Sequence, residues 1–249
     1  MANLLAWEHG RRETLVKRPP SSSGPTAMED YYRERAPWYD LFYRTPEWQD
    51  ELARLQNWVC RRTAGSSVLE VAAGTGFWTA AAARRAKSIV ATDYNAEPLA
   101  VASKRQLGAH ATFLVADAYA LPMFDCAFDV GMAHLWWSHV DKRRERVFLS
   151  HFAARLRTGA ELLMIDQRYS ESCSMPAFRR DRAGNRYELR SLENGRIFQI
   201  IKNYPTPEQL QASLSDLCEE VEVTSLHYFW ALRARVRNDA RGRRRPPRR

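Results

Sequence analysis

The chain lacks the long apolar runs and paired cysteines that mark several classes of protein. None of its apolar runs reaches about eighteen residues, the length that a transmembrane helix needs. Its N-terminus has no basic segment followed by the apolar stretch of a secretory signal. The four cysteines are far apart and form no CxxC pair, which argues against a zinc site and a disulfide framework. These absences predict a cytoplasmic protein with reduced thiols, no metal and no membrane partner.

The chain also has little net charge outside its two ends. The total is +9, of which residues 233–249 carry +8 and residues 1–28 carry +2, so residues 29–232 carry −1. The block RGRRRPPRR is typical of a solvated tail, and we expect a disordered basic tail at 238–249. A near-neutral body does not suggest a nucleic-acid partner.

Composition and length suit one large α/β domain, since 45% of the 249 residues are hydrophobic. Residues 1–27, which contain PPSSSGPT, have the composition of a disordered leader. The domain is expected at 28–237 and begins with a helical cap at 28–62. Pro37 interrupts the first, aromatic-rich part of this cap, and apolar residues at helical spacing follow Pro46.

Strands and helices then alternate along the chain. Short apolar runs predict strands at 67–71, 88–93, 112–116, 128–133 and 161–166. Helices are expected at 74–86, 97–106 and 141–157, the last ending at Gly159. Repeated β–α units of this size predict a doubly wound, mostly parallel sheet with helices on both faces.

An insert at 170–205 interrupts this alternation. Residues 185–191 and 196–201 flank a short turn and predict a β-hairpin. A helix at 206–217 follows, with Thr206 as N-cap, Pro207 at its start and Gln209 three residues on. Residues 220–235 suit either one long strand or a tight hairpin.

The segment VLEVAAGTGFWT, residues 68–79, carries the most information about function. An apolar strand holds the acid Glu70, and Gly74 and Gly76 follow before a helix. The segment resembles motif I of class I S-adenosylmethionine-dependent methyltransferases, acid-x-Gly-x-Gly-x-Gly, with Ala72 at the first glycine position. The resemblance implies a Rossmann-like seven-stranded sheet. It also implies that Ala72, Gly74 and Gly76 lie under the cofactor and that Glu70 orients their loop.

Acids after the next two strands strengthen the resemblance. Asp93 ends the second strand, and its carboxylate can accept from both ribose hydroxyls. In the family, this position binds ribose, and the acid and amide at Asp117 and Ala118 bind adenine. Tyr94 is a candidate to cover the adenine. An NAD site is disfavoured because the G-x-G-x-x-G spacing is missing.

Two further segments provide candidates for the transfer itself. The run FDVGMAHLWWSHV, residues 128–140, resembles the family's fourth-strand motif, whose loop lies beside the transferable methyl. This makes His134 and His139 candidate bases and His134 also a cofactor contact. Tyr169 is a third catalytic candidate. The run YYRERAPWYD resembles the N-terminal cap of small-molecule members, which implies cofactor contacts from Tyr31 and Tyr39, with Tyr32 a further candidate.

Together these features predict a methyltransferase that acts on a small-molecule acceptor at O, N or C and releases S-adenosylhomocysteine. The Asn/Asp-Pro-Pro-Tyr pattern of many base N-methyltransferases is absent after the fourth strand. Two alternatives remain open: a nucleic-acid methyltransferase that uses the arginine-rich tail, and a non-catalytic cofactor-binding protein. We expect a monomer or a homodimer.

Overall fold

The computed structural model describes residues 26–105, 107, 110–171 and 174–238. The expected leader lies outside these residues except for its last two, which already belong to the first helix. The expected basic tail from residue 239 onward and Cys173 also lie outside them. In the described part of the chain, no helix is long and apolar enough to cross a membrane.

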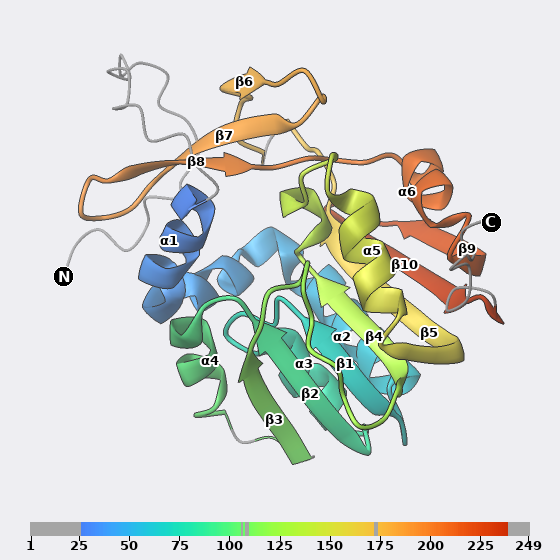
Figure 1. Cartoon of the computed structure of the whole chain (residues 1–249). Coiled ribbons are helices and arrows are strands. Elements are labelled where there is room, and N and C mark those ends of the chain that lie inside the picture. The colour runs from blue at the N-terminus through green and yellow to red at the C-terminus, as the bar shows by residue number, and fades with distance from the viewer. Residues whose placement is uncertain (1–25, 106, 108–109, 172–173, 239–249) are drawn as a thin grey trace, which may run out of the picture.

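A seven-stranded sheet forms the centre of the molecule and confirms the expected Rossmann-like fold (Figure 1). Its order is β3-β2-β1-β4-β5-β10-β9. The strands span Ser67–Val71 (β1), Ser88–Asp93 (β2), His110–Val115 (β3), Phe128–His134 (β4), Leu156–Gln167 (β5), Cys218–Ser225 (β9) and Phe229–Val236 (β10). The first five run parallel, and β10 is antiparallel to β5 and β9. Because the strand order reverses beside β1, a ligand crevice is expected at the carboxyl ends there.

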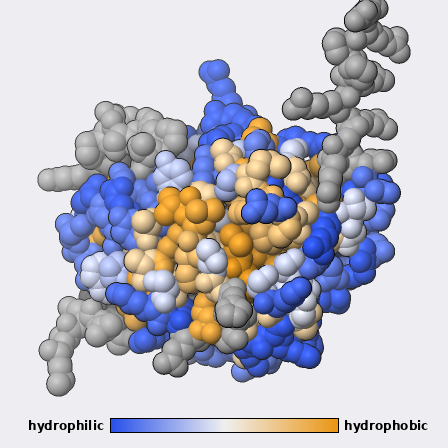
Figure 2. Space-filling model, turned by 60° about the horizontal axis from the view of Figure 1, so that its bottom comes forward, coloured by the Kyte–Doolittle hydropathy of each residue, from blue (hydrophilic) through white to orange (hydrophobic). Residues whose placement is uncertain are grey.

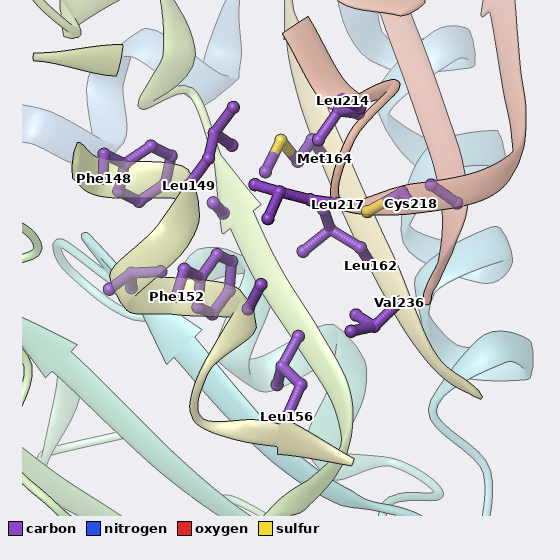
Figure 3. Close-up of a cluster of buried hydrophobic side chains, with 14 of the residues drawn as sticks. Phe148, Leu149, Phe152, Leu156, Leu162, Met164, Leu214, Leu217, Cys218 and Val236 are labelled. Carbon is purple, nitrogen blue, oxygen red and sulfur yellow. The ribbon is translucent and has the colours of Figure 1, made fainter. Parts of the chain in front are cut away.

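Helices cover both faces of this sheet. Helices α2 (Gln49–Arg62) and α3 (Phe77–Ala83) lie behind it in Figure 1, and α5 (Glu145–Ala153) lies in front. Phe148 and Phe152 of α5 belong to the same buried cluster as Leu162 and Met164 of β5 (Figure 3). Helix α6 (Pro207–Leu214) adds Leu214 to this cluster. The parallel strands are buried from both sides, which explains why their sequences read as continuous apolar runs.

The N-terminal cap consists of α1 (Thr26–Arg35), two 3-10 segments, Ala36–Arg44 (η1) and Pro46–Trp48 (η2), and α2. Proline near the start of η1 ends the α-helix as expected, because it cannot donate a backbone N–H. The expected hairpin is also confirmed, as β7 (Arg186–Ser191) and β8 (Ile197–Ile201). With β6 (Arg179–Arg180), they form a small antiparallel sheet beside α1 (Figure 1). We call this sheet the lid.

Several expected boundaries were wrong. The helix expected at 141–157 ends at Ala153, and Gly159 lies inside β5 instead of after the helix. Leu156 suits a helix face by spacing, but it begins the strand, where a Cβ on Gly131 would approach its side chain at 2.7 Å. The helices expected at 74–86 and 97–106 shorten to α3 and α4 (Ala96–Ala102). Of the two alternatives for residues 220–235, the structure has the hairpin, formed by β9 and β10.

The chain between β3 and β4, residues 116–127, contains no helix. Leu114, Val115 and Met123 in and after β3 are exposed. Seen from below, one face of the molecule gathers apolar residues in its middle and hydrophilic residues at its margin (Figure 2).

Candidate active site

A cavity of about 470 Å³ lies where the carboxyl ends of β1, β2, β3 and β4 meet the cap and the lid. This volume is within the range of small-molecule pockets, roughly 300–1,000 Å³. Of the residues proposed from sequence, those that line it are Tyr32, Tyr39, Ala72, Gly74, Asp93, Tyr94, Asp117, Ala118, His134 and His139. Four others, Tyr31, Glu70, Gly76 and Tyr169, do not line it.

The loop after β1 has the left-handed backbone that its glycines suggest. Gly74 and Gly76 have φ angles of 56° and 78°, and Ala72, at the family's first glycine position, has a φ of 54°. A Cβ on Gly76 would lie 2.8 Å from the Cβ of Ala102 on α4. Gly76 therefore allows close helix packing behind the cavity, whereas Ala72 and Gly74 form part of its wall.

Glu70 supports this loop from below. Its side chain is buried, and its Oε2 accepts a hydrogen bond from the hydroxyl of Thr79 on α3 at 2.6 Å. Burial raises the pKa of Glu70 to about 8, and the nearby charge of Asp93 adds to the increase. The carboxyl thus ties β1 to the start of α3 without reaching the cavity.

Asp93 joins the loops after β1 and β2. Its Oδ2 accepts from the backbone N–H of Gly74 and its Oδ1 from that of Asn95, both at 2.9 Å. Burial raises the pKa of this carboxyl, and the backbone donors oppose the increase. The backbone N–H of Tyr94 also donates to this carboxylate, and since a carboxylate offers about four acceptor sites, capacity remains for a ligand. Asp117 is arranged similarly, accepting from the backbone N–H of Tyr119 at 2.8 Å.

The cap is tied to these loops by polar contacts between distant parts of the chain. The hydroxyl of Thr75 donates to Oδ1 of Asp40 at 2.5 Å. Arg105 forms an ion pair with Asp40, and its Nε donates to the carbonyl of Thr75 at 2.6 Å. On α1, the carbonyl of Glu29 accepts from Nδ2 of Asn95 at 2.9 Å. Sequence reasoning did not find these residues, because each partner lies 30 or more positions away.

Tyr32 and His139 form a hydrogen-bonded pair at the cavity wall. The two side chains are 2.8 Å apart, from Tyr32 Oη to His139 Nε2. His139 Nδ1 lies 2.7 Å from the carbonyl of Ile201, which can only accept, so Nδ1 carries the proton and Nε2 accepts from Tyr32. Burial and the charges of Lys202 and Arg190 lower the pKa of His139 well below its usual value.

Tyr31, expected at the cofactor, instead packs against the lid. Its ring centroid is 5.6 Å from that of Phe198 on β8. Adjacent residues on a helix point about 100° apart, so only one of Tyr31 and Tyr32 can face the cavity. Tyr39, on η1, lines the cavity as expected.

Among the described residues, four side chains that line the cavity hold buried polar atoms without a hydrogen-bond partner, and they are Glu29, Trp78, His134 and Trp136. Neither ring nitrogen of His134 has a hydrogen-bond partner among the described residues, and burial lowers its pKa to about 3. Oε2 of Glu29 is likewise buried without a partner in the described part of the chain. Buried polar groups are normally hydrogen-bonded, so Glu29 and His134 fit a ligand with donors and acceptors. S-adenosylmethionine offers both at its hydroxyl, amino and carboxylate groups.

Tyr169 does not reach the cavity. It is 53% exposed, and its ring packs edge-on against Tyr204 at 5.5 Å between centroids. Because Tyr169 is not among the residues that line the cavity, the catalytic role expected of it has no support in the geometry. Among the residues that the structure describes, no group of three or more His, Cys, Asp or Glu residues could hold a metal ion.

Comparisons with known proteins agree with this geometry. A family model described as a methyltransferase domain matches residues 68–159. DhpI in complex with S-adenosylhomocysteine has a TM-score of 0.70 and 25% identity, over 86% of this chain and 97% of DhpI. This chain is a class I S-adenosylmethionine-dependent methyltransferase.

Other comparisons place the methyltransferase among enzymes of the same fold. DhpI in a complex with S-adenosylmethionine and HEP has a TM-score of 0.69 and 27% identity, over 83% of this chain and 95% of DhpI. The N-methyltransferase NodS from Bradyrhizobium japonicum WM9, in complex with S-adenosylhomocysteine, has a TM-score of 0.60. It is 15% identical, over 83% of this chain and 97% of NodS. No curated protein sequence matches the chain.

Proposed function

We propose that the methyltransferase transfers the methyl group to a small-molecule acceptor bound under the lid. The observation that carries this proposal is a single cavity of about 470 Å³ that joins the cofactor loops to Tyr32 and His139. Because the cofactor fills much of this volume, the remaining space suits a small acceptor. The fold serves such acceptors elsewhere: CalS10, with a TM-score of 0.54, is described as an amino pentose methyltransferase.

The cofactor half of the cavity is assigned to residues at the ends of β1, β2 and β3. We assign Asp93 to the ribose hydroxyls, Asp117 and Ala118 to the adenine, and the Ala72–Gly74 loop to the methionine part. When bound, S-adenosylmethionine supplies a methyl group on an activated sulfonium. The main task of the protein is then to hold the nucleophile in line, which can be worth ~7–11 kcal/mol.

We propose that the hydroxyl of Tyr32 binds the nucleophilic O–H or N–H of the acceptor. Burial raises the pKa of Tyr32 well above its usual value, so the phenol stays protonated and donates to Nε2 of His139. Its oxygen keeps lone pairs that can accept a hydrogen bond from an acceptor O–H or N–H. As that proton moves to Tyr32 Oη, the phenol proton passes to His139 Nε2. The lowered pKa of His139 means that it holds this proton only transiently.

Calorimetric titration with S-adenosylmethionine, S-adenosylhomocysteine and NADH tests the cofactor assignments. Both adenosyl ligands should bind and NADH should not. Asp93→Ala should weaken the adenosyl ligands about ten- to hundredfold, because it removes an acceptor for charge-assisted hydrogen bonds. Asp50→Ala, on the exposed side of α2, is the matched control. Unchanged binding by Asp93→Ala would contradict the assignment.

Radiolabelled transfer tests the acceptor class. A cell extract is incubated with the enzyme and methyl-labelled cofactor and then separated by ultrafiltration. We expect label in the low-molecular-weight fraction. Tyr32→Phe should lower its rate of appearance while S-adenosylhomocysteine affinity stays unchanged. Label confined to RNA, DNA or protein would contradict a small-molecule acceptor.

A further inference from the structure

The charged residues that line the cavity fall into two groups along the chain. The first group, at the assigned cofactor loops and on α1, contains the acids Glu29, Asp93 and Asp117. The second group belongs to the loop after β4 and to the lid, and it contains Asp141, Arg143, Arg144 and Arg179. Three arginines against one acid give the second group a net positive charge, whereas the first group is acidic.

Asp141 does not neutralise all three arginines, because its carboxylate already forms an ion pair with Arg143. Nε of Arg143 lies 3.1 Å from both carboxylate oxygens, and Nη2 lies 2.5 Å from Oδ2. This pairing is the largest cause of the lowered pKa of Asp141, about 2. The charges of Arg144 and Arg179 therefore remain uncompensated by Asp141.

The guanidinium groups of Arg144 and Arg179 each lie over a tyrosine ring. The guanidinium carbon of Arg179 is 3.8 Å from the ring centroid of Tyr187, and that of Arg144 is 3.7 Å from the centroid of Tyr119. In the described part of the chain, no carboxylate forms an ion pair with either group, although the charge of Arg144 opposes the rise that burial causes in the pKa of Glu29. A stacked guanidinium keeps its N–H donors in its plane, where they can bind an oxyanion in a bidentate way.

Arg179 is the better placed of the two for an acceptor. With its amide oxygen turned toward the arginine, Gln199 accepts from Nη2 of Arg179 and, at 3.0 Å, from its Nε, and so holds one edge of the guanidinium. The edge between the two terminal nitrogens remains available for a ligand. Gln199 and Tyr187 belong to the lid, as Arg179 does, so all three are positioned by one small sheet.

We infer that the acceptor is a small acid whose carboxylate or phosphate group is bound by Arg179, with Arg144 adding to the attraction. This inference rests on the proposed function, since it names the chemical class of the acceptor in the same cavity. Behind Tyr32 and His139, Lys202 and Arg190 are each paired with a carboxylate, Asp166 and Glu188, so the charge that favours an acid comes from the arginines that line the cavity.

The test uses the full chain saturated with S-adenosylhomocysteine. Inorganic phosphate and benzoate are titrated by calorimetry and by tryptophan fluorescence, since Trp136 lines the cavity. Benzamide is the neutral counterpart of benzoate. We expect at least one anion to bind, benzamide to bind more weakly, and Arg179→Gln to weaken the anion about ten- to hundredfold. Arg144→Gln should have a smaller effect in the same direction.

Arg180→Gln is the matched control, because Arg180 neighbours Arg179 on β6, points to the other face of the strand and does not line the cavity. It should leave anion binding unchanged. Binding of phosphate without benzoate would indicate a phosphate group on the acceptor, and binding of benzoate without phosphate would indicate a carboxylate. If S-adenosylhomocysteine binds but neither anion does, or if Arg179→Gln and Arg180→Gln behave alike, the inference is overturned while the proposed function stands. Methyl transfer to macromolecules alone would instead overturn the proposed function.

Discussion

Ala72 has a backbone conformation that favours glycine, at the point where β1 turns into the cofactor loop. Its φ of 54° costs an L-residue roughly 1–2 kcal/mol. The family's glycine at this position has a physical reason, and the alanine here is strained.

Ala72→Gly should therefore raise the free energy of unfolding by up to about 1 kcal/mol, because relief of strain exceeds the entropy that glycine adds to the unfolded chain. Urea denaturation measures it. Ala73→Gly, the neighbour without positive φ, should lower stability by roughly 0.5–1 kcal/mol. Equal losses in both variants would show that Ala72 is unstrained.

Glu70 should make stability depend on pH. Its pKa is about 8 in the folded protein, above the ordinary value of 4.5, so the folded state binds the proton more tightly. The stabilisation is complete below pH 4.5 and is lost as the pH rises to about 8. His134 acts oppositely, since its pKa of about 3 favours folding above the ordinary value of 6.5.

The difference between wild type and Glu70→Gln isolates the acid from the histidine. Glutamine keeps an acceptor for Thr79 but does not titrate. We expect the variant to gain stability relative to wild type as the pH rises from 5 to 8, measured by urea denaturation at each pH. A difference that is constant across this range would contradict the raised pKa.

At the scale of elements, the lid depends on one buried carboxylate. Glu188 on β7 is fully buried and pairs with both Arg186 and Arg190. It also accepts from the hydroxyl of Tyr204 at 3.2 Å. This carboxylate, shared by two guanidinium groups, lies on β7, the strand with which β6 and its Arg179 pair.

Glu188→Gln should lower the free energy of unfolding by about 3–5 kcal/mol, because it leaves buried positive charge without its partner. Thermal denaturation measures the loss. Glu193→Gln, in the exposed turn of the same hairpin, should change stability by less than about 0.5 kcal/mol. A small loss in Glu188→Gln would mean that other groups compensate the two arginines.

For the whole molecule, α1 is the element that connects the sheet to the lid. The carbonyl of Glu29 is bonded to Asn95 after β2, and Tyr31 packs on Phe198 of β8. Since Glu29 and Tyr32 also line the cavity, a bound cofactor should hold α1 against both the sheet and the lid.

S-adenosylhomocysteine at 100 times its Kd should stabilise the protein by ~2.7 kcal/mol. Amide hydrogen exchange should show its largest local protection in α1, with little local change in the buried helix α5. Asn95→Ala should reduce the protection of α1. Equal protection of both helices would show that cofactor binding does not order the cap specifically.

Local patterns in the sequence were sufficient for much of the fold. The parallel strands were predictable because buried strands are short apolar runs with turn residues at their ends. The capping box was also predictable, and Thr206 and Gln209 form it at the start of α6. The glycine loop and the acids at Asp93 and Asp117 were proposed from their resemblance to the family's motifs, and they lie together because the carboxyl ends of parallel strands meet at one edge.

The sequence alone thus determined the fold class, the cofactor and the position of its loops, because each depends on residues close together in the chain. Only the tertiary structure decided which tyrosine of the cap faces the cavity, that Tyr32 donates to His139, and that Tyr169 lies outside. It alone brought Arg179 and Gln199 of the lid to the cavity. These contacts join segments whose relative position depends on packing of the entire chain, and no local pattern records that packing.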